Sequence, residues 1–144
     1  AGLAAIIGIP GLGLYLVAHA IGISLTIDTT TLTDTWWRIP ALVASALANS
    51  WAEEIVMIGY LLTRLRQLGW SPNRSLLAAA VLRGAYHLYQ GFGGFIGNLI
   101  MGLIFGRYWQ RTGRLLPLVA AHALIDIVAF VGYGLLKGHV SWLP

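Results

Sequence analysis

Six ionisable side chains interrupt apolar stretches of this sequence, and their types are those that can carry out hydrolytic chemistry. They are Glu53, Glu54, Arg83, His87, His122 and Asp126. Arg83 and His87 are four residues apart, as are His122 and Asp126, so the members of each pair share a face if their segment is helical. Ionisable groups in apolar surroundings are costly and usually functional. The set therefore indicates a candidate hydrolytic site, with a structural polar network as the alternative.

This set of groups could hydrolyse an amide in two ways. In the first, Glu53 acts as a general base on a water molecule that His87 helps to place, and His122 with a neighbouring polar group stabilises the oxyanion. In the second, Glu53, His87 and His122 bind a zinc ion that acidifies the water. The residues leave both mechanisms open, so the expected cofactor is either none or zinc.

Other hydrolase chemistries lack the residues that they require. The chain has no cysteine, no G-x-S-x-G nucleophile elbow and no H-E-x-x-H zinc helix. Asp126 is the only aspartate within an apolar segment, which excludes a paired-aspartate protease. Two alternatives of other classes are a catalytically inactive scaffold or peptide-binding immunity protein, and a haem-binding bundle with His87 and His122 as axial ligands.

The composition indicates which elements must position these groups. Hydrophobic residues make up 58% of the 144 residues and charged residues only 10%, whereas a soluble domain carries roughly 25% charge. The mean hydropathy is +0.76. These values favour an all-α, polytopic transmembrane bundle, because helices satisfy their own backbone in lipid. The net charge of +4 is typical of basic cytoplasmic loops, so membrane lipids rather than nucleic acid are the expected surroundings.

Five apolar segments have about the length of a membrane helix. We expect a single transmembrane domain over residues 1–144, with helices over residues 3–27, 38–63, 75–90, 95–109 and 116–136. Residues 28–35 read as a polar loop with a helix N-cap near Asp34. Counted from the cytoplasmic ends of their helices at about 1.5 Å per residue, the ionisable groups and the polar Asn98 lie at a similar depth in the membrane. This predicts a polar cavity between the second, third and fifth helices.

The basic residues predict the orientation of the chain. Six of the nine fall in two loops, after the second and the fourth helix: Arg64, Arg66, Arg74, Arg107, Arg111 and Arg114. The positive-inside rule places both loops in the cytoplasm of a multi-pass membrane protein. Tryptophans at segment ends, among them Trp142, fit an interfacial belt.

Three motifs occur in order on the polar helices: EEIVMIGY at residues 53–60, RGAYHLYQG at 83–91 and HALID at 122–126. Together they resemble the CAAX-protease and bacteriocin-processing family, which includes the type II CAAX prenyl endopeptidase-like intramembrane proteases. The family's motifs are E-E-x-x-x-R, F-x-x-x-H and H-x-x-x-N/D, and the resemblance covers about residues 49–130. It implies an intramembrane endopeptidase that cleaves a peptide or a lipidated protein.

The resemblance also implies a role for each residue. Glu53 and His87 would activate water, His122 and Asp126 would support the oxyanion, and Glu54 would be a supporting partner. Both metal-dependent and metal-free mechanisms are proposed for the family. Ile58 replaces the usual arginine of the first motif, and Arg83 replaces the usual phenylalanine of the second. We therefore expect Arg83 to supply the missing positive charge to Glu54 or Glu53 from the neighbouring helix. Asp126 stands where asparagine is common, and it must be protonated, orient His122 or bind a cation.

Overall fold

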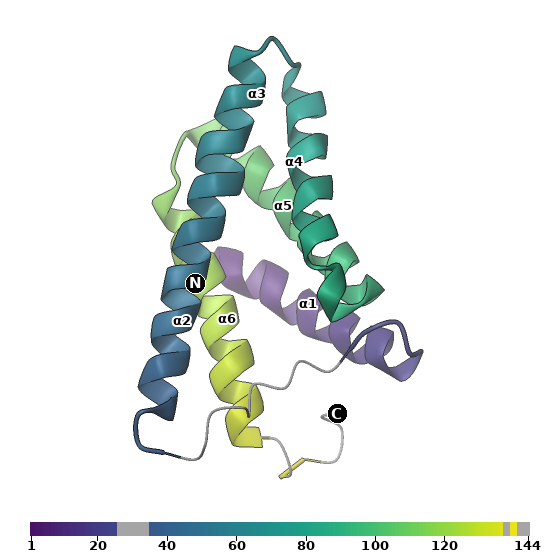
Figure 1. Cartoon of the computed structure of the whole chain (residues 1–144), viewed down its shortest axis with the longest axis vertical. Helices are drawn as coiled ribbons and strands as arrows, with labels where there is room; N and C mark the ends of the chain where they lie inside the picture. Colours follow the sequence, from purple (N-terminus) through teal and green to yellow (C-terminus); the bar gives the residue numbers. More distant parts are fainter. Residues whose placement is uncertain (26–34, 137–138, 141–144) are drawn as a thin grey trace.

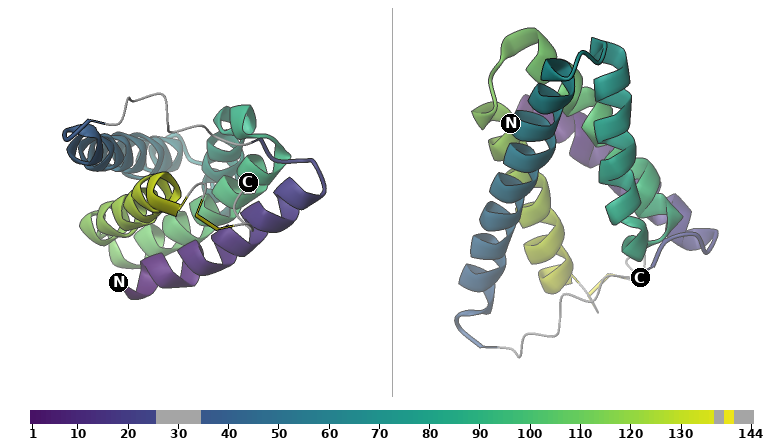
Figure 2. Two further views of the ribbon diagram at one scale, coloured as in Figure 1. Left: turned by 90° about the horizontal axis from the view of Figure 1, so that it is seen from below. Right: turned by 45° about the horizontal axis from the view of Figure 1, so that its top comes forward.

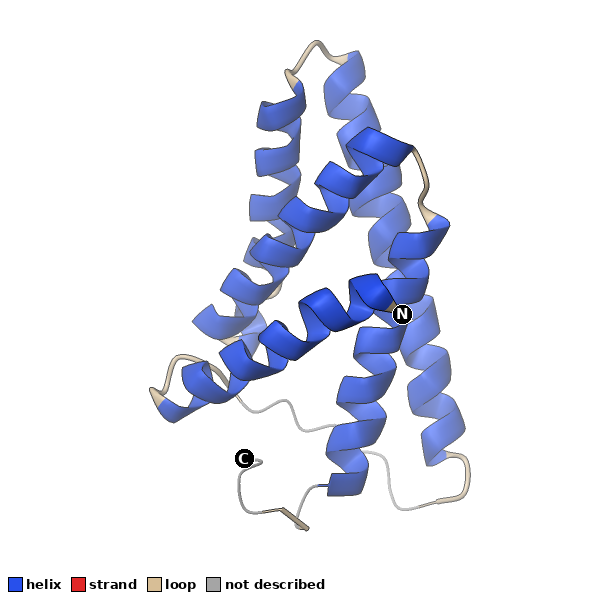
Figure 3. Ribbon diagram, turned by 180° about the vertical axis from the view of Figure 1, so that it is seen from behind, coloured by secondary structure: helices blue, strands red, loops and turns tan. Residues whose placement is uncertain are grey.

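The structure, a computed structural model, describes residues 1–25, 35–136 and 139–140. This described part consists of helices joined by short loops (Figure 3), with one isolated β-bridge between Ser24 and Gly91. The elements in chain order are α1 (Gly2–Ala20), α2 (Arg38–Glu53), η2 (Glu54–Leu62), α3 (Thr63–Gln67), α4 (Pro72–Tyr86), η3 (Leu88–Gln90), α5 (Phe92–Thr112) and α6 (Leu116–Leu136). The predicted all-helical bundle is confirmed.

Three of the helical stretches in the described part are long and apolar enough to cross a membrane, whereas we expected five. They are Gly2–Ala20, the continuous stretch Arg38–Gln67 and Leu116–Leu136. The first of these is shorter than predicted, because the chain leaves the helix at Ile21 and Gly22 adopts a positive φ of 76°. The predicted N-cap at Asp34 and the predicted interfacial Trp142 lie outside the described residues.

The third and fourth predicted helices begin earlier than expected. Ser71 caps α4 by accepting a hydrogen bond from the backbone N–H of Arg74 at 3.3 Å, and Pro72 occupies the first turn, where its missing N–H is harmless. α5 follows Gly91, whose φ of 86° reverses the chain. It continues to Thr112, where Gly113 ends it in the left-handed conformation.

Two helix pairs make up most of the packing. α2 lies beside α6, and α4 lies beside α5, while α1 crosses over α5 and α6 (Figures 1 and 2). η2 connects the two pairs, because it contacts both α4 and α5. Buried apolar side chains of η2, α4, α5 and α6 form one core, with Ile58, Leu62, Ala79, Met101, Phe105, Leu118 and Ala121.

Two glycines let α4 approach α5 closely. A Cβ atom at Gly102 would lie 3.1 Å from the Cα atom of Ala80, and one at Gly106 would collide with the side chain of Leu76. Small residues at such positions are typical of helix contacts in membranes. This close approach fixes the height of α4 in the bundle, and with it the position of the polar residues at its end.

Candidate active site

The two glutamates lie where the second membrane helix changes its winding. Glu53 is the last residue of α2, and Glu54 is the first residue of η2, a π-helical segment within the continuous helix. Such segments are rare and occur frequently at functional sites. The side chain of Glu54 is fully buried, whereas that of Glu53 keeps 14% of its surface exposed. Of the two carboxylates, only that of Glu53 is accessible from outside the bundle.

Arg83 of α4 lies at the centre of the polar cluster. Its Nη2 atom is 2.7 Å from Oε1 of Glu54 and 3.3 Å from Oε2 of Glu53. The guanidinium also lies over the ring of Phe105, 5.8 Å from its centroid. The ion pair that we expected between Arg83 and a glutamate is therefore present. Ile58, at the position of the missing arginine, is instead buried in the apolar core.

His87 faces Glu53 through one defined ring nitrogen. Its Nδ1 atom lies 2.9 Å from the backbone carbonyl of Arg83, and because a carbonyl only accepts, Nδ1 carries the hydrogen. Nε2 is then directed at Oε1 of Glu53, 3.7 Å away. This distance is too long for a direct hydrogen bond. It suits two groups that share one water molecule.

A tight turn after α4 holds His87 in this place. The N–H of His87 donates to the carbonyl of Gly84, and the N–H of Gln90 donates to the carbonyl of His87. The segment after α1 stabilises this turn, because the N–H of Leu25 donates to the carbonyl of Gln90 at 2.9 Å. The position of His87 is therefore fixed by backbone hydrogen bonds from two parts of the chain.

His122 of α6 lies between two carboxylates. Its Nδ1 atom is 2.8 Å from Oε1 of Glu54, and its Nε2 atom is 3.5 Å from Oδ2 of Asp126. The side chain is 3% exposed. Of the three roles considered for Asp126, this placement fits the orientation of His122.

Asn98 does not join these groups in the described structure. Its side-chain amide donates to the backbone carbonyl of Gly94, one turn earlier in α5, at 3.1 Å. The predicted similar depth of Asn98 therefore does not bring it into contact with the cluster, because its side chain is bonded to its own helix. Its supporting role stays a prediction.

The polar cavity predicted between the second, third and fifth helices stays a prediction. A cavity of about 530 Å³ lies elsewhere, with a lining drawn from α1, α4 and α5. At the cluster, the buried polar atoms that form no hydrogen bond among the described residues are Oε2 of Glu54, Nε and Nη1 of Arg83, and Oδ2 of Asp126, the last of which has only its 3.5 Å contact with His122. Because buried polar atoms are normally hydrogen-bonded, these positions are suited to water or to polar groups of a substrate.

The alternative of a zinc site formed by Glu53, His87 and His122 finds no support in this geometry. Among the described residues, no group of three or more acidic, histidine or cysteine side chains is arranged to hold a metal ion. The cation at the centre is the guanidinium of Arg83, which lies 3.2 Å from Nδ1 of His122. The haem alternative also loses support, because both ring nitrogens of His122 face carboxylates.

Tyr86 is a member of the cluster that the sequence patterns did not reveal. Its hydroxyl donates to Oε2 of Glu53 at 2.9 Å, and its ring lies against that of His87 with centroids 4.5 Å apart. It therefore contacts both of the groups proposed to activate water. The only signal in the sequence is its position immediately before His87. That position alone does not indicate that the hydroxyl of Tyr86 contacts Glu53.

We predict that Tyr86→Phe lowers kcat about tenfold while KM stays nearly constant. The change removes one hydrogen bond to a charged group, worth about 1.5 kcal/mol, and keeps the ring. Steady-state cleavage kinetics would measure the effect. Tyr60→Phe is the matched control, because Tyr60 is exposed and contacts Arg64 instead of the cluster. An equal loss in both variants would contradict the assigned position of Tyr86.

The described groups thus comprise a partly exposed carboxylate, an imidazole that faces it, and a buried arginine–carboxylate–imidazole network behind them. This arrangement can remove a proton from water and stabilise a developing negative charge. The sequence model of the Rce1-like family, described as Type II CAAX prenyl endopeptidase Rce1-like, matches residues 35–128. No curated protein and no solved structure matches the chain. The match extends over well over half of the chain and includes every residue of the cluster, so this chain belongs to the Rce1-like family of type II CAAX prenyl endopeptidases.

Proposed function

We propose that the chain is an intramembrane endopeptidase that hydrolyses a peptide bond with water activated by Glu53 and His87. The observation that carries this proposal is the pairing of the one partly exposed glutamate with Nε2 of His87 at 3.7 Å. Membership of a family of membrane proteases supports the peptidase activity. The inactive scaffold, the other candidate, has no specific observation in its favour.

The proposed reaction uses Glu53 as a general base. Its carboxylate accepts a proton from a water molecule shared with His87, and the water oxygen attacks the carbonyl carbon of the scissile bond. The carbonyl oxygen becomes an oxyanion, and the proposed stabilising donor is an N–H at Nε2 of His122. This nitrogen lies 3.5 Å from Oδ2 of Asp126, too far for a strong hydrogen bond, whereas Nδ1 is held by Glu54. When the tetrahedral intermediate collapses, the C–N bond breaks and the proton held by Glu53 passes to the leaving nitrogen. No step requires a metal ion.

Arg83 and Glu54 act in this scheme as positioning residues. Arg83 contacts both carboxylates through one nitrogen, so it holds Glu53 and Glu54 at fixed positions relative to each other. Glu54 in turn holds Nδ1 of His122. The fully buried ion pair thereby connects the water-activating side of the cluster with the proposed oxyanion side.

The substrate proposed from the family is a membrane-associated peptide or lipidated protein cut near its C-terminus. Prenyl groups are attached to the cysteine of a C-terminal C-a-a-X sequence, and such a lipid would hold the peptide at the bilayer. We further propose that the arginine-rich loops lie in the cytoplasm, because positively charged loops are retained on that side.

The test is cleavage of a farnesylated C-a-a-X peptide by the purified protein in lipid vesicles. We expect cleavage near the prenylated cysteine, and the same rate after treatment with a chelator. The unmodified peptide shows whether the lipid is recognised. Absence of cleavage with both peptides would overturn the proposal in favour of the inactive scaffold. Loss of activity on chelation, with recovery on addition of zinc, would overturn the metal-free mechanism.

A further inference from the structure

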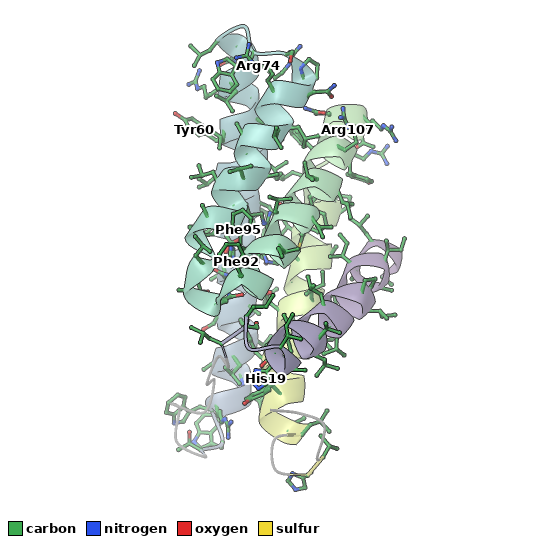
Figure 4. All side chains as sticks on the ribbon, turned by 90° about the vertical axis from the view of Figure 1, so that its right-hand side faces the viewer. His19, Tyr60, Arg74, Phe92, Phe95 and Arg107 are labelled. Carbon is green, nitrogen blue, oxygen red and sulfur yellow. The ribbon has the colours of Figure 1, made fainter. Side chains whose placement is uncertain are left out.

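The cavity of about 530 Å³ combines an apolar wall with two arginines. Leu76 of α4 and Leu103 and Ile104 of α5 contribute to the wall, and Arg107 and Arg111 lie one turn apart on α5 at its edge. None of the residues of the polar cluster lines it. Figure 4 shows Arg107 towards the end of the molecule that also carries Arg74, with His19 towards the opposite end.

The charge of Arg107 is held in place without a carboxylate. Nη2 donates to Oδ1 of Asn73 at 2.7 Å, and Nη1 donates to Oε1 of Gln110 at 3.0 Å. These amide oxygens are neutral, so they orient the guanidinium but leave its charge uncompensated. Arg111 is exposed and likewise forms no ion pair within the described part of the chain.

The acidic residues of the described part are all engaged elsewhere. They are Glu53, Glu54 and Asp126, which belong to the polar cluster. Two positive charges therefore lie beside an apolar hollow with no described anion to neutralise them. A ligand that complements both features is an anionic amphiphile.

The position of the cavity near the end of α5 indicates which kind of anionic amphiphile it binds. Arg107 and Arg111 lie in the last two turns of α5, which ends at Thr112. Arg107 bonds to Asn73, close after the end of the candidate membrane span Arg38–Gln67, and the end of a membrane helix lies near the lipid headgroups. Basic pockets between membrane helices bind the headgroups of anionic lipids. The volume is within the range of ligand pockets and accommodates a segment of an acyl chain.

We propose that this cavity binds an anionic phospholipid of the surrounding membrane. Its phosphate contacts Arg107 and Arg111, and part of an acyl chain packs against Leu76, Leu103 and Ile104. Guanidinium groups suit phosphate because they donate two parallel hydrogen bonds. A zwitterionic lipid brings no net charge to the arginines, so it binds more weakly. The inference is independent of the proposed peptidase activity, because the two sites share no residue.

The experiment measures thermal unfolding of the purified full chain in detergent micelles doped with phosphatidylglycerol or with phosphatidylcholine of the same acyl chains. A third arm contains inorganic phosphate alone. We expect phosphatidylglycerol to raise the unfolding temperature and to remain bound in native mass spectrometry, with little effect in the other two arms. In Arg107→Gln the apparent affinity for phosphatidylglycerol falls about fivefold or more.

Arg64→Gln is the matched control. Arg64 also bonds to a neutral amide, since its Nη1 atom donates to Oε1 of Gln67 at 2.7 Å, but it is more exposed than Arg107 and does not line the cavity. This variant should respond to phosphatidylglycerol as the original chain does. Equal effects of the two lipids, or an equal loss in both variants, would overturn the proposal. Full stabilisation by inorganic phosphate would show a site for free anions instead of a lipid site.

Discussion

Replacing Glu53 with glutamine is expected to lower the rate of peptide cleavage by about 10²–10⁴-fold, the usual contribution of a general base. Glutamine has nearly the same shape and can still accept a hydrogen bond from the hydroxyl of Tyr86. It carries no negative charge and cannot take a proton from water. The loss should therefore appear in kcat, measured with a prenylated peptide in vesicles.

The control for Glu53→Gln is the stability of the variant, measured as its unfolding temperature. Glu53 keeps part of its surface exposed, and the buried pair of Arg83 with Glu54 remains in this variant. We thus expect its unfolding temperature to stay close to that of the original chain. Full activity in Glu53→Gln would show that another group activates the water.

Arg83→Met is expected to destabilise the folded protein by about 3–5 kcal/mol and to abolish cleavage. Removing one partner of a buried ion pair leaves the other charge without compensation. Here the remaining charge is that of Glu54, which has no solvent exposure. Unfolding in detergent, followed by tryptophan fluorescence, measures the effect. The control Arg74→Met removes an exposed arginine of the same helix that lies over the ring of Trp70, and its effect should stay within about 0.5 kcal/mol.

Two double variants distinguish the loss of charge compensation from the loss of side-chain packing at Arg83. In the double variant Arg83→Met with Glu54→Gln, the unpaired charge is gone, so most of the lost stability should return. The pair Ile58→Arg with Arg83→Phe places arginine and phenylalanine where the family pattern has them. It should be more stable than either single variant, because one buried cation again faces the glutamates. If the double variants are as unstable as Arg83→Met, the ion pair is not what holds the cluster together.

Much of the fold could be predicted from the sequence, because long apolar segments in a chain with few charges leave little choice but membrane helices. Leu116–Leu136 was predicted with the bounds that the structure has. The contact of Arg83 with the glutamates was also predictable, since two departures from one motif pattern compensate each other in charge. The convergence of Glu53, His87 and His122 followed from their similar depth along three helices.

Other features depend on contacts that the sequence patterns do not specify. The π-helical winding from Glu54 to Leu62 occurs in a segment whose hydrophobic pattern also fits an ordinary helix. Tyr86 reaches Glu53 because α4 ends at this residue and the chain then turns. Asn98 is bonded to its own helix, which depth along the helix axis does not predict. The zinc alternative left out the guanidinium of Arg83, which contacts two of the expected ligands, Glu53 and His122.

The most direct measurement of the central claim is a single-turnover cleavage in water labelled with oxygen-18, with mass spectrometry of both the product and the protein. If Glu53 acts as a base on water, the new carboxylate of the product gains one labelled oxygen in the first turnover and Glu53 gains none. Label in the side chain of Glu53 with an unlabelled product would mean that the carboxylate attacks the substrate itself. That result, or the absence of hydrolysis, would contradict the account.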